Sequence, residues 1–195
     1  TMGPLVHNPQ ALKMLESRNV YVADGIDESL RDKTVVTRAH GVPPKTIERL
    51  GEIGAQVVDG TCPNVIRSQV IIKKYYSIGY SIVIVGDRGH AEIDSLLGFA
   101  DNNATVVENI EEARVLPHMG KACVVAQTTL NIPMYDEVAE EIRKHADECF
   151  VAKTVCSSTM HRQEDVRMLA EKTDATVVVG GRNSANTNRL AEISR

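Results

Sequence analysis

The sequence lacks the patterns that would assign it to several common classes of protein. It has no C-x-x-C pair, which argues against a zinc ribbon and against a thioredoxin-type redox site. No apolar run approaches the roughly 20 residues that a membrane-spanning helix needs. The first residues do not follow the basic-then-apolar layout of a secretion signal, and no Gly-rich P-loop is present. We therefore expect a soluble, cytoplasmic protein with no membrane partner.

Charge and cysteine content narrow the possibilities further. The 195 residues carry a formal net charge of −4 at pH 7 and no block of basic residues, which argues against a nucleic-acid partner. Of the four cysteines, Cys123 lies within an apolar strand and Cys149 is expected at a helix end. We interpret both as packing residues. Any metal site must then be assembled from residues that are far apart in the sequence, among them Cys62 and Cys156.

Short β-branched runs alternate with helical stretches along the chain. The runs predict buried parallel strands at 20–23, 34–37, 56–59, 81–85, 122–126 and 176–179. The stretches between them predict helices at 44–53, 64–77, 133–147 and 160–172. Alternation of strands and helices of these lengths is typical of α/β units with parallel sheets.

An internal repeat relates two parts of the chain. Cys62 in V-V-D-G-T-C and Cys156 in V-A-K-T-V-C each end a strand and precede a helix rich in Arg, Gln and Lys. In both cases a second apolar strand ends in glycine 24 residues after the cysteine, at Gly86 and Gly180. The following turns, G-D-R-G-H-A-E and G-G-R-N-S-A-N, align at the same offset of 94 residues. A repeat of this kind predicts related structural units.

A second register extends the repeat to the start of the chain. The string R-A-H-G-V-P-P, which contains His40, aligns with A-Q-T-T-L-N-I-P, which contains Thr128, at an offset of 88 residues. By periodicity the cysteine of the first unit is expected roughly 28 residues before His7, upstream of Thr1. We therefore predict a partial first domain at 1–61, a complete second domain at 62–155 and a partial third domain at 156–195.

Three such units predict a trefoil of small, pseudo-threefold-related α/β domains with parallel sheets. Ligands of parallel α/β sheets collect at the carboxyl ends of strands, where helix N-termini supply N–H groups. Three cysteines, one from each unit, can then converge on one centre and hold a cubane cluster by three of its irons. The His, Ser, Thr and Asn residues at the other strand ends are suitable hydrogen-bonding groups for a phosphorylated ligand.

Six strings along the whole chain resemble one enzyme family. In order they are G-P-L-V-H-N-P, R-A-H-G-V-P-P, D-G-T-C-P, G-D-R-G-H-A-E, A-Q-T-T-L and N-S-A-N-T-N-R-L. Their pattern is similar to that of the 4-hydroxy-3-methylbut-2-enyl diphosphate reductases, the LytB-type iron–sulfur reductases. The resemblance implies a [4Fe–4S] enzyme that removes the allylic hydroxyl reductively. The products are isopentenyl and dimethylallyl diphosphates, and this is the last step of the non-mevalonate isoprenoid pathway. The resemblance implies ferredoxin or flavodoxin as the electron donor.

The resemblance also implies a role for particular residues. Cys62 and Cys156 match two of the three cluster ligands, Glu92 matches the carboxylate that supplies protons, and Thr128 matches its hydrogen-bonding relay. The residues that match the family's diphosphate shell are His7, His40, His90, Ser184 and Asn186. The family usually has two serines where this chain has Ser184-Ala185, so one hydrogen bond to the diphosphate is absent or replaced. With two cluster cysteines, the chain alone is expected to hold an incomplete cluster or none, and to be inactive.

Two other functions remain open from the sequence. One is another threefold iron–sulfur enzyme similar to quinolinate synthase, which also uses three scattered cysteines. The other is a non-catalytic α/β module that binds a phosphorylated ligand. Bound iron separates the module from the enzymes, and the substrate that is turned over separates the two enzymes.

Overall fold

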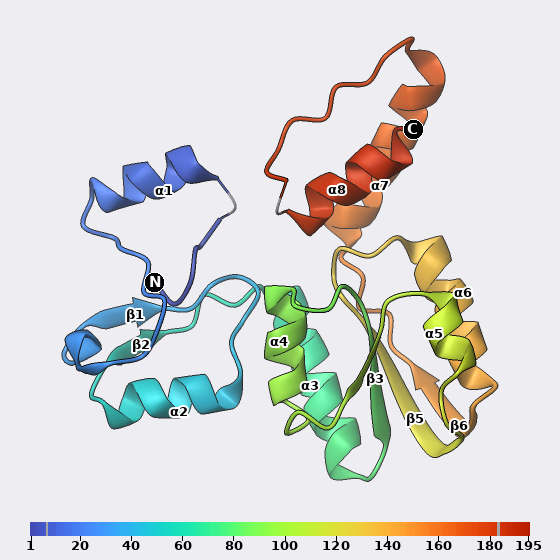
Figure 1. Cartoon of the computed structure of the whole chain (residues 1–195), viewed down its shortest axis with the longest axis horizontal. Helices are drawn as coiled ribbons and strands as arrows, with labels where there is room; N and C mark the ends of the chain where they lie inside the picture. The colour runs from blue at the N-terminus through green and yellow to red at the C-terminus, as the bar shows by residue number, and fades with distance from the viewer. Residues whose placement is uncertain (7, 183) are drawn as a thin grey trace.

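The computed structural model describes residues 1–6, 8–182 and 184–195. Its elements follow one another in the α/β alternation that the sequence predicts, and Figure 1 shows their arrangement. The N-terminal part contains α1 (Pro9–Glu16), a 3₁₀ turn (Glu28–Leu30), β1 (Thr34–Val36), α2 (Pro44–Glu52) and β2 (Gln56–Val58). The central part contains α3 (Pro63–Ser77), β3 (Ser81–Val85), α4 (Ala91–Gly98), β4 (Thr105–Val107), α5 (Ile110–Arg114), β5 (Met119–Ala126), α6 (Ile132–Arg143) and β6 (Ala146–Val151). The C-terminal part contains α7 (Ser157–Lys172) and α8 (Ala185–Ile193).

A four-stranded sheet forms the centre of the molecule. Its strands are all parallel and lie in the order β4-β3-β5-β6. Side chains alternate between the two faces of a strand, and β3 shows the result clearly. Ile82 and Ile84 pack with residues of α3 and α4, whereas Val83 and Val85 pack with residues of α5 and α6. Because both faces are covered, β3 is almost entirely apolar, and its carboxyl end leads into the predicted site.

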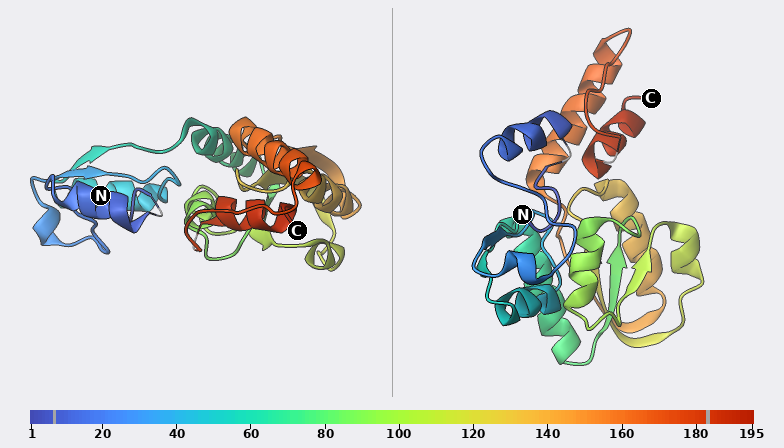
Figure 2. Two further views of the ribbon diagram at one scale, coloured as in Figure 1. Left: turned by 90° about the horizontal axis from the view of Figure 1, so that it is seen from above. Right: turned by 60° about the vertical axis from the view of Figure 1, so that its left-hand side comes forward.

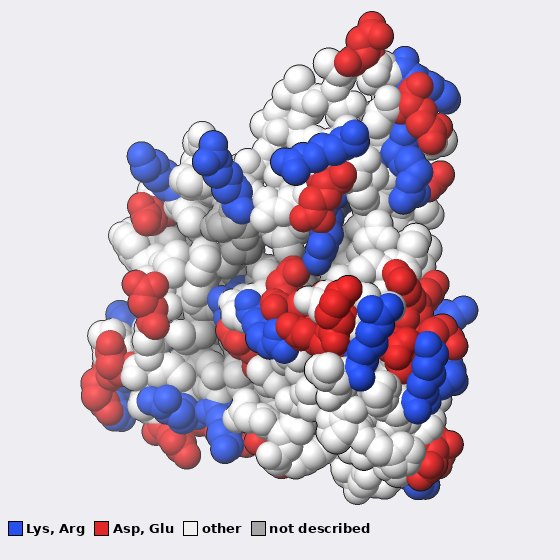
Figure 3. Space-filling view, turned by 45° about the vertical axis from the view of Figure 1, so that its right-hand side comes forward, with Lys and Arg blue, Asp and Glu red and all other residues white. Residues whose placement is uncertain are grey.

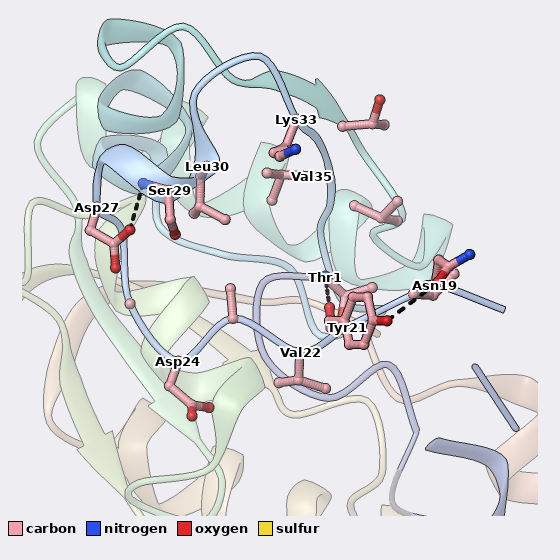
Figure 4. A pocket seen from close by; sticks show the side chains of 15 residues that line it. Thr1, Asn19, Tyr21, Val22, Asp24, Asp27, Ser29, Leu30, Lys33 and Val35 are labelled. Carbon is pink, nitrogen blue, oxygen red and sulfur yellow. Dashed lines mark hydrogen bonds between the residues drawn. The ribbon is translucent and has the colours of Figure 1, made fainter. Parts of the chain in front are cut away.

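The N-terminal part has a smaller sheet of its own. Strands β1 and β2 are parallel, and Met2 forms isolated bridges with Ala23 and Thr37. A pocket of about 800 Å³ lies beside β1 and is lined mainly by segments 19–25 and 33–36. Figure 4 shows that apolar Val22, Leu30 and Val35 line it together with the polar ends of other side chains. This lining does not come from the strand ends that carry the predicted site residues.

The C-terminal helices lie beside each other and project from the central sheet. The three views agree on this arrangement, in which α7 and α8 are separate from the β1–β2 sheet (Figure 1 and Figure 2). Between them, residues 176–179 form no strand, and Val177 and Val179 are 84% and 91% exposed. Among the described residues, no helix combines the length and the apolar character needed to cross a membrane.

The α/β fold and most of its elements confirm the sequence prediction, but four predictions are wrong. The predicted strands at 20–23 and 176–179 are not strands, because apolar residues extend into a strand only where a neighbour completes the hydrogen-bond ladder. Only Ala23 of the first segment forms a bridge. The predicted helix at 133–147 ends at Arg143, and β6 begins at Ala146. Cys149 therefore lies in a strand opposite Ala122 and not at a helix end.

Candidate functional site

Glu92 is a buried carboxyl group at the start of α4. It is 2% exposed, although a charged residue is rarely buried without a partner. Its Oε1 accepts a hydrogen bond from the backbone N–H of Thr128 at 2.7 Å, and its Oε2 lies 2.8 Å from the hydroxyl of Thr128. Thr128 follows β5, so two neighbouring strand ends bring these residues together across 36 positions of sequence.

Burial changes the acidity of Glu92. Removal from water disfavours the carboxylate and raises the pKa of Glu92 to about 7, while the two hydrogen bonds from Thr128 act in the opposite direction. Desolvation is the larger effect and sets the direction of the shift. A carboxylic acid with a pKa near 7 can both hold and release a proton at neutral pH, as a general acid must.

Two histidine rings lie at the start of α4. His40 and His90 meet edge to face, with their ring centroids 5.2 Å apart. His90 also caps α4, because its Nδ1 accepts the backbone N–H of Glu92 at 3.2 Å. In a neutral imidazole this hydrogen bond places the ring proton on Nε2, which is then a donor.

Each of the two predicted cluster cysteines is the N-cap of a helix. Cys62 precedes α3 and Cys156 precedes α7. Asn64, in the first turn of α3, donates its amide to Cys156 Sγ at 3.2 Å. The N-termini of the two helices therefore converge.

The environment of Cys156 favours its thiolate. Burial alone raises the pKa of Cys156, but hydrogen bonds from the backbone and hydroxyl groups of Ser158 and Thr159 together outweigh it, and the pKa is lowered. A metal binds the thiolate, so this environment suits a ligand. Within residues 1–6, 8–182 and 184–195, however, no group of three or more His, Cys, Asp or Glu side chains could hold a metal ion. The thiols of Cys62 and Cys156 are of the donor type that an iron–sulfur cluster takes, and they form no group of three such side chains with the other described residues.

Backbone hydrogen bonds join the cysteines to the other site residues. The N–H of Cys62 donates to the carbonyl of Ala39, directly before His40, at 2.9 Å. The N–H of Cys156 donates to the carbonyl of Thr128, also at 2.9 Å. The contacts of Glu92 with Thr128 and of His90 with His40 complete the connection. Six predicted site residues thus lie in one connected group: His40, Cys62, His90, Glu92, Thr128 and Cys156.

The remaining predicted residues come from the two ends of the chain. Ser184 is the N-cap of α8, and its hydroxyl oxygen accepts the N–H of Thr187 at 3.3 Å. Asn186 is in the first turn of the same helix, and its Oδ1 is buried without a hydrogen-bond partner among the described residues. His7 lies outside the described residues.

The sequence interpretation missed two residues that organise the site. Gln127 is fully buried and hydrogen-bonds with Asp87, and Asn64 contacts Cys156. Gln127 stands within A-Q-T-T-L, directly beside Thr128, and a polar residue at the end of an apolar strand was the available signal. No local sequence pattern indicates a role for Asn64, because Cys156, which it contacts, lies 92 positions away.

Comparison with known proteins gives consistent matches over the whole chain. A sequence model of the family described as "LytB protein" matches residues 1–195. The chain is 38% identical over 195 residues to the 4-hydroxy-3-methylbut-2-enyl diphosphate reductase of Caldanaerobacter subterraneus, covering 99% of this chain and 68% of the relative. It is 36% identical over 195 residues to the same reductase of Alkaliphilus oremlandii, covering 100% of this chain and 70% of the relative. The chain thus spans about two thirds of the length of these relatives.

Two solved structures share the fold. One is the E-1-hydroxy-2-methyl-but-2-enyl-4-diphosphate reductase of Plasmodium falciparum, with a TM-score of 0.92 and 24% identity over 99% of this chain and 62% of that chain. The other is described as (E)-4-hydroxy-3-methyl-but-2-enyl diphosphate reductase, the terminal enzyme of the non-mevalonate pathway. It has a TM-score of 0.73 and 36% identity over 99% of this chain and 69% of that chain.

Proposed function

Because the chain belongs to the LytB family, the oxidoreductases of the last step of the non-mevalonate isoprenoid pathway, we propose that Glu92 supplies the proton for this reaction. The reaction is the reductive removal of the allylic hydroxyl of 4-hydroxy-3-methylbut-2-enyl diphosphate. The observation that carries the proposal is the buried carboxyl group of Glu92, whose pKa is raised to about 7 and whose oxygens both contact Thr128. The family match favours neither a quinolinate synthase-like enzyme nor a non-catalytic binding module.

The two contacts of Glu92 give the proton a direction. The N–H of Thr128 can only donate, so Oε1 of Glu92 is occupied as an acceptor. In the structure the Thr128 hydroxyl donates to Oε2. In the neutral acid the proton lies on Oε2, and this hydrogen bond reverses so that Oε2 donates to the hydroxyl oxygen of Thr128. The Thr128 hydroxyl hydrogen can then point to a substrate hydroxyl. A proton then passes from Glu92 through the Thr128 hydroxyl to the substrate oxygen, which leaves as water. A general acid assists this step because hydroxide is a poor leaving group.

The cysteines would hold the [4Fe–4S] cluster that the family uses. Cys62 and Cys156 supply two thiolates from converging helix N-termini, and the third ligand is proposed to lie upstream of Thr1. When bound, the cluster supplies single electrons and an open iron site for the substrate oxygen. Asn64 orients Cys156, because its amide donates to the sulfur.

Neutral donors would bind the diphosphate. His90 Nε2 is a donor when its Nδ1 accepts the N–H of Glu92, and His40 lies beside it. Ser184 and Asn186 at the N-terminus of α8 add a hydroxyl, an amide and backbone N–H groups, which favour an anion. The proposed diphosphate-binding residues are His7, His40, His90, Ser184 and Asn186. We further propose the domains 1–61, 62–155 and 156–195, a ferredoxin or flavodoxin as electron donor, and a cytoplasmic location.

Glu92→Gln in the full-length enzyme tests the proposal. Glutamine keeps the acceptor for the Thr128 N–H and a polar group for its hydroxyl, but it has no acidic proton. Turnover should therefore fall by at least about 10²-fold, the lower end of what a general acid contributes. Substrate affinity should change little, because the diphosphate-binding residues are untouched.

The measurements are anaerobic steady-state rates with a chemical reductant, product identification, and titration of the cluster spectrum with substrate. Lys144→Ala is a suitable control, because it removes an exposed amine that pairs with Glu141 on α6. Turnover of Glu92→Gln within a few-fold of the parent contradicts the role of Glu92. Turnover of dihydroxyacetone phosphate with iminoaspartate by the parent supports a quinolinate synthase-like enzyme instead.

A further inference from the structure

A charged contact outside the proposed proton relay joins α8 to the central part of the chain. Arg189 Nη2 on α8 donates to Asp87 Oδ1 at 2.9 Å, and the side chain of Arg189 is only 19% exposed. Asp87 lies in the turn between β3 and α4, 102 positions away in the sequence. Figure 3 shows acidic and basic side chains close together in the band where the C-terminal helices approach the central sheet.

Gln127 holds Asp87 from the opposite side. Its Nε2 donates to Asp87 Oδ2 at 3.2 Å, and its Oε1 accepts the backbone N–H of Asp87 at 2.8 Å. The two carboxylate oxygens of Asp87 thus have different partners, one on α8 and one at the end of β5. Gln127 is fully buried and immediately precedes Thr128, so this anchor is rigid and close to the proposed relay.

The ion pair is adjacent to the residues proposed to bind diphosphate. The carbonyl of Asp87 accepts the N–H of His90 at 3.2 Å, so the position of Asp87 determines that of the His90 turn. On α8, Arg189 is three residues after Asn186, which places the two side chains on the same face of the helix. A pocket of about 300 Å³ between the turn and α8 is lined by Asp87, His90 and Arg189 among others.

From these contacts we propose that Asp87 and Arg189 are positioning residues for the diphosphate. Their ion pair sets the distance between the turn that carries His90 and the N-terminus of α8. It thereby sets the width of the proposed site, which has His90 on one side and Ser184 and Asn186 on the other. This inference rests on the proposed function, because it assigns a purpose to the ion pair only if those residues bind the diphosphate. Both the charge and the shape of the Arg189 side chain matter for this positioning. Its Nη2 donates to Asp87, and its Nη1 donates to Glu192 at 3.1 Å.

A different role for Arg189 would give different results. If Arg189 bound the diphosphate directly, Asp87 would compete with the ligand for the guanidinium group, and Asp87→Asn would tighten binding. If the ion pair positions α8, Asp87→Asn and Arg189→Ala both weaken binding, because either change removes the same contact. The effects of the two substitutions on binding should also be non-additive, because both residues act through the same contact.

The experiment measures inorganic diphosphate binding to the full-length, cluster-loaded enzyme by calorimetry, with substrate turnover in parallel. We expect Asp87→Asn and Arg189→Ala each to raise the Kd by about 10-fold, and the double variant to raise it no further. Arg189→Lys should recover part of the affinity because it keeps the charge. The kcat at saturating substrate should stay within about two-fold of the parent while KM rises, because the proton relay is intact.

Controls separate positioning from misfolding and from failure of the proposed function. Lys144→Ala, which removes an exposed amine at the end of α6, should bind diphosphate as the parent does. Cluster content and thermal unfolding are compared for every variant, so that only folded, loaded enzyme is scored. Tighter binding by Asp87→Asn, or a Kd for Arg189→Ala within two-fold of the parent, overturns the inference. If the parent itself neither binds diphosphate nor turns over the substrate, the proposed function fails instead.

Discussion

At the scale of single residues, the environment of Glu92 gives it its chemistry. Most carboxyl groups in this chain are exposed or face a cation, as Glu112 faces Arg88 at 2.6 Å. That arrangement lowers the pKa of Glu112, with the hydrogen bond from Arg88 as the first cause. Glu92 instead faces a neutral hydroxyl group and one N–H in a buried site, and its pKa is raised to about 7. The pKa values of two glutamates of one chain are thus shifted in opposite directions, because burial desolvates Glu92 whereas Arg88 hydrogen-bonds to Glu112.

The raised pKa of Glu92 predicts a pH dependence of stability. The ordinary pKa is 4.5, so between pH 4.5 and about 7 the folded protein retains a proton that the unfolded chain releases. The stabilisation is fully present below pH 4.5 and is lost as the pH rises through 7. Glu92→Gln does not titrate. The free energy of unfolding of the parent should therefore fall relative to that of Glu92→Gln, by about 3 kcal/mol over this range.

Urea denaturation of the two full-length proteins at a series of pH values measures this difference. The substitution Glu137→Gln on α6 is a control for loss of a carboxyl group, because Glu137 is exposed. A constant difference between parent and Glu92→Gln from pH 4.5 to 8 would show that Glu92 is not protonated at neutral pH in the folded protein.

Thr128→Val should interrupt the relay without changing the size of the side chain. Valine cannot pass a proton from Oε2 of Glu92, although the backbone N–H of residue 128 still donates to Oε1. We expect turnover to fall by at least about 10²-fold with substrate affinity within a few-fold of the parent. Thr128→Ser keeps the hydroxyl and is the matched control. Turnover of Thr128→Val within a few-fold of the parent would contradict the relay, and equal loss in both variants would mean that side-chain packing, rather than the hydroxyl alone, accounts for the effect.

At the scale of elements, the ends of β3 and β5 determine where the site residues lie. Gly86 at the end of β3 has no space for a side chain, because an added Cβ would lie 2.6 Å from Ile93 and 2.7 Å from Oε1 of Gln127. The close approach lets Gln127 hydrogen-bond with Asp87 in the next turn. A glycine at this strand end thus serves close packing between β3 and the residues that follow β5.

Gly86→Ala should therefore destabilise the protein, by about 1–3 kcal/mol as is typical of overpacking. Because the new methyl group displaces Gln127 and the turn after Gly86, substrate affinity should also fall. Gly51→Ala in α2 is the matched control, since an added Cβ there has no atom within 4 Å. It should stabilise the helix by up to about 1 kcal/mol. Chemical denaturation of both variants measures the changes, and an unchanged stability of Gly86→Ala would contradict this account of the packing.

At the scale of the whole molecule, the site is assembled from all parts of the chain. His40 comes from the N-terminal part, Glu92 and Thr128 from the central sheet, and Cys156 from the start of α7. The described part of the chain nevertheless contains only two cysteines at such helix N-termini, Cys62 and Cys156. A cubane cluster that is bound by three of its irons needs a third thiolate.

The 195-residue chain, produced alone, should accordingly hold no intact cluster. Iron and sulfide analysis after anaerobic reconstitution measures this, and we expect far fewer than the about four irons per chain of a [4Fe–4S] protein. The full-length protein, reconstituted in parallel, is the control for the procedure. A stable visible band with near four irons per chain would contradict the assignment of Cys62 and Cys156 as two ligands of three.

The sequence by itself determined the α/β class, the alternation of elements and the family. Strands such as 81–85 are buried on both faces, so local apolar runs were enough to predict them, and the repeat of Cys62 at Cys156 indicated related strand ends. The segments 20–23 and 176–179 look equally strand-like in sequence, but a strand exists only where a neighbour supplies the hydrogen bonds.

Only the tertiary structure decided how the strand ends meet. The raised pKa of Glu92 depends on burial beside Thr128, and burial is a property of the packed chain rather than of the residue. The contacts of Asn64 with Cys156 and of Arg189 with Asp87 join positions 92 and 102 residues apart. No local pattern encodes them, because each depends on the position of two elements that the sheet and its helices bring together.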